Sequence, residues 1–130
     1  VNIPILKTAL VSDSLGFHFP GRGFLPLFLT DYERYIQTIE YLESLNPKII
    51  GPGHQGPLTG RNATNSIKMA KEATQRMLSR VTDTNIDLSN IADEIFLECY
   101  RDEFTIYSES NIRSVTELLV RRGRESRSMI

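Results

Sequence analysis

The chain has 130 residues, which is enough for one compact domain or for a small domain with an appendage. It is 40% hydrophobic and 24% charged, with eight Gly and six Pro, so wholesale disorder and a disulfide scaffold are excluded. Fifteen basic against sixteen acidic residues give a net charge of −1, which provides no global electrostatic reason to expect nucleic acid or an anionic membrane as a partner.

The first segments of the chain predict a strand and a loop. Residues 5–11, ILKTALV, are apolar and rich in strand formers, and the polar turn SDS follows them. This pattern predicts a mostly buried strand that ends at Asp13. Residues 16–29 mix Gly and Pro with apolar side chains at no clean period, which predicts a loop that buries its own apolar residues or covers another part of the protein.

A helix and a second strand follow. Thr30 and Glu33 form a capping box, so a helix is predicted to start there. Apolar side chains then recur every three or four residues and form one stripe along the helix, at Tyr35, Ile36, Ile39, Leu42 and Leu45. Asn46 and Pro47 end this helix, and residues 48–50, KII, predict a short strand. The two strands and their covering helix form a βαβ unit, in which the strands are expected to lie parallel.

After residue 60 the pattern changes to three amphipathic helices, predicted at about 63–80, 89–101 and 110–122. Gly123 is placed as the C-terminal cap of the last one. Residues 104–107, FTIY, predict a short extended segment. Cys99 is the only cysteine and falls on the apolar stripe of its helix, where it is predicted to be buried. A chain with one cysteine has no intrachain disulfide, which favours the cytoplasm.

Asp13 and His54 both follow predicted strands. LVSDSLG places a carboxylate at the end of the first strand, and KIIGPGHQG places an imidazole just past the second. If the strands are parallel neighbours, both residues emerge at the same edge of the sheet, where open α/β sheets build their sites. The alternatives are an aspartate that serves a turn and a partly exposed turn histidine.

The same stretches carry a family resemblance. The strand end ALVSDSLG, the capped helix after a glycine-rich loop and LNPKIIGPGHQG resemble the C-terminal half of a metallo-β-lactamase-fold hydrolase over residues 3–60. The later helices, with NIRSVTELLVRRGRES, are similar to the helical C-terminal extension of some hydrolases in this superfamily. The resemblance implies an α/β fold made of half of an αββα sandwich, a small mixed sheet with covering helices in residues 1–60, followed by a helical C-terminal extension in residues 61–130.

The resemblance also implies a metal site. In the family, the aspartate at this strand end bridges two metal ions and the histidine of the PGH turn binds the second, so Asp13 and His54 take these positions. Zinc is the expected metal, with iron or manganese as alternatives. Such a pair of ions activates water for attack on an ester, thioester, lactone or similar bond of a small-molecule substrate. His18 and Phe17 are candidates for the substrate pocket, against an ordinary loop histidine and a core aromatic.

The remaining family ligands are missing from this chain. They come from a His-x-His-x-Asp-His motif and one further His, all N-terminal to the strand that ends at Asp13, whereas this chain contains His18 and His54 only. Because stable zinc sites have three or four protein ligands, zinc is expected to be weakly bound or absent here. The sequence therefore predicts a C-terminal fragment of a metal-dependent hydrolase, inactive as an isolated chain. The alternative is a non-catalytic binding or oligomerisation module derived from that fold.

The expected partners follow from this hypothesis. The sheet face that the missing N-terminal half covers in the family should be apolar, and large exposed apolar patches drive association. The partner is therefore either that half or a second copy bound through the sheet. The tail RRGRESR at 121–127 is locally +3, but arginines at a helix C-terminus favour the helix dipole, so nucleic acid is not expected. No apolar run approaches the roughly 20 residues that span a bilayer, so no membrane partner is expected either.

Overall fold

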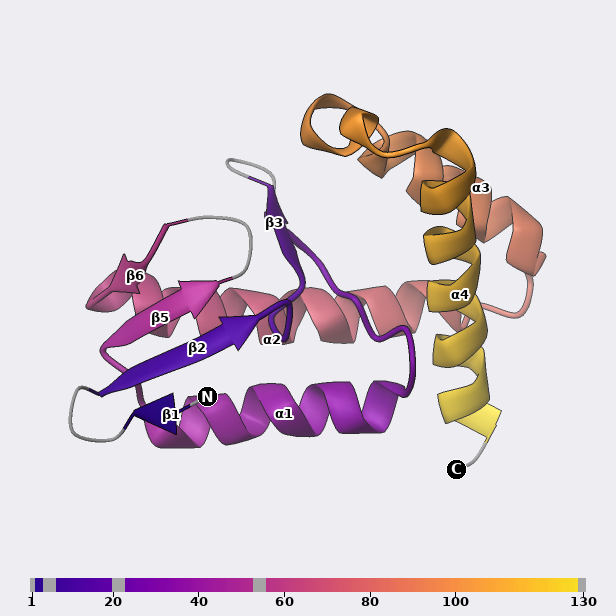
Figure 1. Cartoon of the computed structure of the whole chain (residues 1–130). Coiled ribbons are helices and arrows are strands. Elements are labelled where there is room, and N and C mark those ends of the chain that lie inside the picture. The colour runs from indigo at the N-terminus through magenta and orange to yellow at the C-terminus, as the bar shows by residue number, and fades with distance from the viewer. Residues whose placement is uncertain (1, 4–6, 20–22, 53–55, 129–130) are drawn as a thin grey trace. The chain divides into compact units, whose positions relative to one another are not determined.

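The structure is a computed structural model that describes residues 2–3, 7–19, 23–52 and 56–128 (Figure 1). Within these residues it is an α/β structure with a small mixed sheet and four α-helices, of which the last is C-terminal, so the predicted α/β class is confirmed. The chain divides into two compact units, residues 1–27 with 33–76 and residues 28–32 with 77–130. No helix of the described ranges is long and apolar enough to cross a membrane.

The sheet of the first unit has the strand order β1–β2–β5–β6, with β1 (Asn2–Ile3), β2 (Thr8–Ser12), β5 (Ile49–Pro52) and β6 (Leu58–Thr59). The central strands β2 and β5 are parallel, which confirms the expectation from the βαβ pattern. The edge strands run antiparallel to their neighbours, β1 to β2 and β6 to β5. They were not predicted, because two residues are too few to show a period. Residues 5 and 6 of the predicted first strand lie outside the described residues.

Two helices pack against the sheet of this unit. They are α1 (Tyr32–Leu45) and α2 (Arg61–Val81), whose predicted positions are confirmed (Figure 1). The core combines β2, β5 and both helices through Ala9, Val11, Leu15, Ile39, Leu42, Ile50, Ala63, Ile67 and Ala70. Successive side chains of a strand point to opposite faces, so Leu10, between two core residues, lies on the other face and is 49% exposed.

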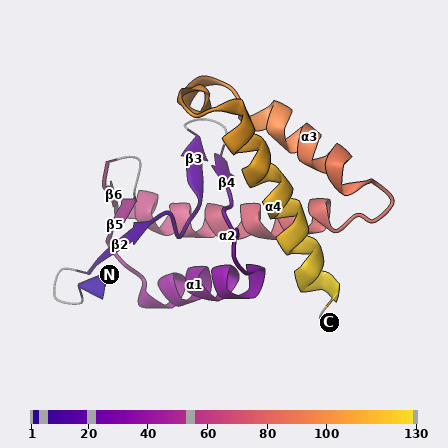
Figure 2. The same cartoon turned by 45° about the vertical axis from the view of Figure 1, so that its right-hand side comes forward.

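Residues 16–29 contain a hairpin instead of the predicted loop. Strands β3 (Phe17–Phe19) and β4 (Gly23–Leu25) pair antiparallel, as Figure 2 shows. His18 lies opposite Phe24 in the register, and their rings are 4.7 Å apart, a cross-strand contact that stabilises the pair. The prediction failed because strands of three residues, flanked by Gly and Pro, are too short to show alternation.

The second unit contains α3 (Leu88–Cys99), the 3₁₀ helix η2 (Asp102–Ile106) and α4 (Glu109–Ser128). The helices predicted at 89–101 and 110–122 are confirmed. The extended segment predicted at 104–107 is wrong, because residues 102–106 form the 3₁₀ turn, with Phe104 only 4% exposed as its anchor. Cys99 is half-buried, so it lies less deep than its place on the apolar stripe predicted.

Gly123 is not a C-terminal cap, because α4 continues past it to Ser128. The residue is buried, and a Cβ placed on it would overlap Cγ2 of Val81 and lie 3.6 Å from side-chain atoms of Leu78 and Phe28. The glycine therefore allows close packing inside a helix and does not end one. Sequence alone did not distinguish these two uses, since both need a residue without a side chain.

Two arginines of the basic tail, Arg122 and Arg124, make internal contacts. Nε of Arg124 donates to the carbonyl oxygen of Val81 at 2.9 Å, and its Nη2 donates to those of Asp83 at 3.0 Å and Ile86 at 2.6 Å. Arg122 pairs with Glu125 at 2.9 Å. These two side chains are therefore part of the packing of the second unit.

Candidate functional site

The parallel register brings the predicted strand ends together. Ala9 pairs with Ile50 and Leu10 with Gly51, and after a register shift Ser12 pairs with Pro52. Asp13 directly follows β2, so it lies at the edge of the sheet where β5 also ends. His54 comes two residues after Pro52 and lies outside the described residues. The structure therefore places Asp13 beside the start of the GPGHQG loop, and the position of the imidazole stays a prediction.

A tight turn carries Asp13. The amide of Ser14 donates to the carbonyl of Val11 at 2.8 Å, and the amide of Gly16 donates to the carbonyl of Asp13 at 2.9 Å. Leu15 anchors the turn in the core with only 3% of its surface exposed, whereas Asp13 is exposed. A buried leucine and two backbone hydrogen bonds thus present the carboxylate at the surface.

Gly16 closes the turn and could not be another residue without rearrangement. Its φ of +89° is a conformation that side chains disfavour. A Cβ at this position would overlap the carbonyl oxygen of Leu25 and lie 3.0 Å from the hydroxyl oxygen of Tyr35. The carbonyl oxygen of Leu25, at the end of β4, and the hydroxyl of Tyr35, on α1, therefore lie close to the backbone of Gly16.

Tyr35 contributes a buried hydroxyl beneath this turn. Burial, the largest effect, raises the pKa of Tyr35 to about 12. The nearby Asp13 carboxylate raises the pKa further. At neutral pH the hydroxyl is therefore protonated. The sequence predicted Tyr35 only as part of an apolar stripe, because spacing shows which face a residue lies on and not what its hydroxyl touches.

His18 and Phe17, the predicted pocket residues, lie on β3 in the same unit as Asp13. Both are half-buried, and the ring of Phe17 lies 4.9 Å from that of Phe19. A hollow of about 540 Å³ in this unit is lined by other residues, at the opposite end of the parallel strands: Asn46, Pro47, Lys48, Gly60, Arg61, Thr64 and Asn65. Neither His18 nor Phe17 lines that hollow, so their role as substrate contacts stays a prediction.

The described residues do not make up a metal site by themselves. They contain no group of three or more His, Cys, Asp or Glu side chains placed to hold a metal ion. Asp13 offers one exposed carboxylate, and stable zinc sites need three or four protein ligands. Asp13 fits one position of a larger coordination shell, and no catalytic step is assigned to this chain alone.

Comparison of the sequence with protein-family models and with curated proteins found no match. The resemblance to metallo-β-lactamase-fold hydrolases therefore depends on the residues that carry it, and it stays a prediction.

Proposed function

We propose that this chain is the C-terminal part of a metal-dependent hydrolase with a metallo-β-lactamase fold. In this proposal Asp13 and His54 would hold the metal ions, most simply zinc, together with ligands from the rest of the protein. The register that pairs Ser12 with Pro52 is the observation that supports the proposal most strongly. It sets the Asp13 turn beside the segment that leads to His54, at the edge where α/β sheets bind ligands.

The exposure of Leu10 on the sheet also supports the proposal. Sheets made only of parallel strands are almost always covered on both faces, and the central pair of this mixed sheet is parallel. In the first unit, the described helices pack against the face that carries Ala9 and Val11, whereas Leu10 on the other face is 49% exposed. The missing N-terminal half of the fold is the partner that we propose for this second face.

The chemistry of the proposed whole protein is hydrolysis of an ester, thioester or lactone in a small-molecule substrate. Paired metal ions in such a site supply an activated water and polarise the bond that is attacked. The role of this chain is to hold Asp13 and His54 in place, and His18 and Phe17 are proposed to contact substrate. Because the other ligands belong to the missing half, we propose that the isolated chain is inactive, and we place the protein in the cytoplasm.

Paramagnetic broadening by Mn²⁺ tests the proposed ligand pair in the isolated chain. NMR signals of residues near Asp13 and of residues 53–55 should broaden first as Mn²⁺ is added, with weak affinity. The variant Asp13→Asn should lose this broadening. Asp87→Asn is the matched control, because Asp87 is also exposed and makes no side-chain cap to α3. The proposal is contradicted if the broadening is the same in Asp13→Asn as in the wild type, or if no local broadening occurs.

A non-catalytic binding or oligomerisation module is the second candidate, favoured by the exposure of Leu10 on the sheet. Sedimentation analysis should then show an oligomer that the variant Leu10→Lys dissociates. Metal content and hydrolysis of a generic ester and a phosphodiester discriminate further. A stable oligomer without metal or activity supports the module, whereas metal-dependent hydrolysis by the isolated chain contradicts the incomplete site.

A further inference from the structure

The end of α3 and the 3₁₀ helix η2 expose apolar side chains among carboxylates. Leu97 is 72% exposed, Ile106 81% and Tyr107 38%. We propose that the 93–109 surface, meaning the exposed side chains of residues 93–109, binds a basic segment of another protein that also carries apolar side chains. All of these residues belong to the second unit, so the proposal does not depend on the metal site proposed in the first.

The segment that presents Ile106 is tied down on both sides. Phe104 anchors η2 with only 4% of its surface exposed, and its ring meets that of Tyr107 edge to face at 6.0 Å. The hydroxyl of Tyr100 donates to the carbonyl of Tyr107 at 2.9 Å. Ile106 therefore points outward from a fixed turn, so a partner that binds it has little chain to order, which favours affinity.

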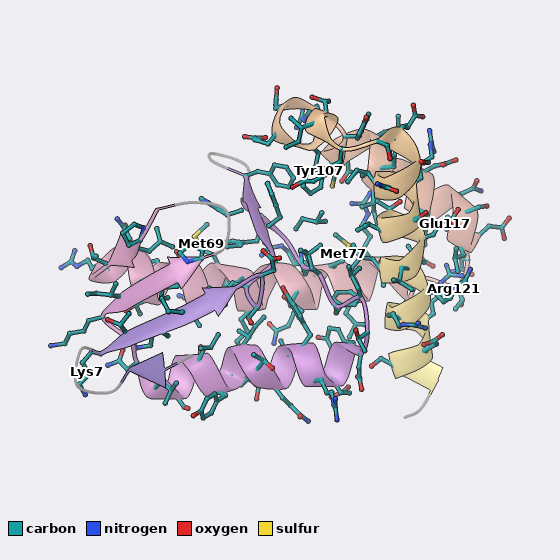
Figure 3. All side chains as sticks on the ribbon, in the orientation of Figure 1. Lys7, Met69, Met77, Tyr107, Glu117 and Arg121 are labelled. Atoms are coloured by element: carbon teal, nitrogen blue, oxygen red, sulfur yellow. The ribbon has the colours of Figure 1, made fainter. Side chains whose placement is uncertain are left out.

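Tyr100 connects Leu97 with the exposed residues of η2. It follows Leu97 by three residues, which places the two on the same side of the helix end. Its ring stacks on that of Phe96 at 4.9 Å, and its hydroxyl reaches the backbone of Tyr107, which is labelled in Figure 3. Leu97 and the exposed residues of η2 are therefore neighbouring parts of one surface. Neighbouring exposed apolar side chains, rimmed by polar ones, mark interaction sites.

This part of the chain is strongly acidic. Residues 80–113 contain eight carboxylates and three arginines, a net charge of −5, whereas the rest of the chain has twelve basic and eight acidic residues. Two of the arginines each contact two carboxylates at 2.7 to 3.5 Å, Arg80 those of Glu94 and Glu98, and Arg113 those of Asp93 and Glu109. More than half of each of these four acidic side chains stays exposed. The 93–109 surface therefore remains negative after its internal ion pairs are counted.

The charge of the 93–109 surface decides the class of partner. A negative surface repels the phosphates of nucleic acids and the headgroups of anionic lipids. Lysine and arginine side chains of a partner protein are attracted to the exposed carboxylates, and such complementary charges speed association and select the partner. Leu97 and Ile106 then supply apolar area that becomes buried on binding. A basic segment with apolar side chains is the occupant that matches both features.

Fluorescence anisotropy of the whole chain with a labelled amphipathic peptide made only of Leu and Lys tests the proposal. The peptide should bind at low salt, and a peptide with Glu in place of each Lys should not. Leu97→Ser and Ile106→Ser should each weaken binding about threefold to tenfold, because each removes apolar area from the contact. Met69→Ser is the matched control, since Met69 is also exposed, at 45%, but lies on α2 in the first unit.

A second pair of variants tests the charge. Glu94→Gln keeps the shape of the side chain and should weaken peptide binding about twofold to threefold at low salt. Glu117→Gln is the matched control, because Glu117 is an exposed glutamate of the same unit, about two turns after Glu109 on α4. Added salt should weaken binding to the wild type, because salt screens exposed charges.

Three results would overturn the proposal: no binding of the Leu and Lys peptide, equal binding to the wild type and to Leu97→Ser and Ile106→Ser, or equally tight binding of the Glu peptide. Sedimentation of the chain without peptide tests a second copy as the occupant. Self-association that Leu97→Ser and Ile106→Ser both abolish would overturn the proposal, as would binding to phosphatidylserine vesicles that these variants abolish. Both variants should unfold at the wild-type temperature, because the two side chains are exposed.

Discussion

At the scale of single residues, Tyr35 makes the first unit sensitive to alkaline pH. Burial raises its pKa from 10.0 to about 12, so the unfolded chain loses this proton at lower pH than the folded chain does. The contribution of Tyr35 is therefore complete below pH 10 and is lost as the pH rises to 12, by about 2 to 3 kcal/mol in all. Urea unfolding at several pH values should show a steeper alkaline loss for wild type than for Tyr35→Phe. Parallel curves for the two proteins contradict the assignment.

Gly123 shows how a single missing side chain permits close packing. A methyl group there would overlap Cγ2 of Val81, a fully buried residue with a stiff side chain. Gly123→Ala should gain about 1 kcal/mol of helix propensity but lose about 1 to 3 kcal/mol through overpacking, so its net effect is neutral to destabilising. Gly56→Ala is the control, because nothing lies within 4 Å of a Cβ at Gly56. Thermal unfolding of the two variants measures the difference, and a clearly stabilised Gly123→Ala contradicts the packing role.

At the scale of elements, Arg124 of α4 caps the end of α2. The carbonyl of Val81 is among the last of its helix and has no partner within that helix, and the guanidinium supplies one while also binding the turn that follows. Arg124→Ala should destabilise the second unit by about 2 kcal/mol. Arg124→Lys should recover less than half of this, since one ammonium cannot reproduce the planar fork.

Arg121 provides the matched control for this prediction. It is the exposed arginine labelled on α4 in Figure 3, three residues before Arg124. Its replacement by alanine removes the same charge from the same helix and should change the unfolding temperature by less than about 2 °C, as expected of surface substitutions. An equal fall in unfolding temperature in the two variants would show that the charge of the tail, and not the hydrogen bonds of the Arg124 guanidinium, stabilises the unit.

The elements that the sequence predicted correctly are those long enough for their apolar pattern to repeat several times. The stripe from Tyr35 to Leu45 and the helices after residue 60 repeat their apolar positions often enough to be recognised, and the βαβ order then indicates the parallel pair. The hairpin of β3 and β4 and the edge strands β1 and β6 are too short for any period. Gly123 was misplaced because its use depends on Val81, which lies 42 positions earlier in the chain.

At the scale of the whole molecule, the candidate site was predictable only where it follows from topology. Asp13 is at the predicted edge because the strand before it is parallel to β5. The approach of the Tyr35 hydroxyl to Gly16 was missed, since the two residues belong to separate elements of the first unit. Helix α2 runs from the first unit into the second, so the change in pattern at residue 60 marks the start of a helix and does not by itself separate the units.

The response of the whole chain to metal follows from its incomplete ligand set. A ligand that binds only the folded state stabilises it by RT ln(1 + [L]/Kd). A complete site with a Kd of about 1 μM would gain about 2.7 kcal/mol at about 100 μM free zinc, which is a rise of several degrees in unfolding temperature for a chain of this size. Two ligands with a Kd of about 1 mM would gain only about 0.06 kcal/mol.

We therefore expect thermal unfolding of the isolated chain to be the same within about 1 °C in zinc and in a chelator. The measurement should be repeated with Asp13→Asn, which controls for zinc bound elsewhere on the surface. A rise of several degrees in zinc that Asp13→Asn abolishes would mean that this chain alone completes the site, because only additional ligands supply that affinity. A rise that persists in Asp13→Asn would place the bound zinc away from the Asp13 turn.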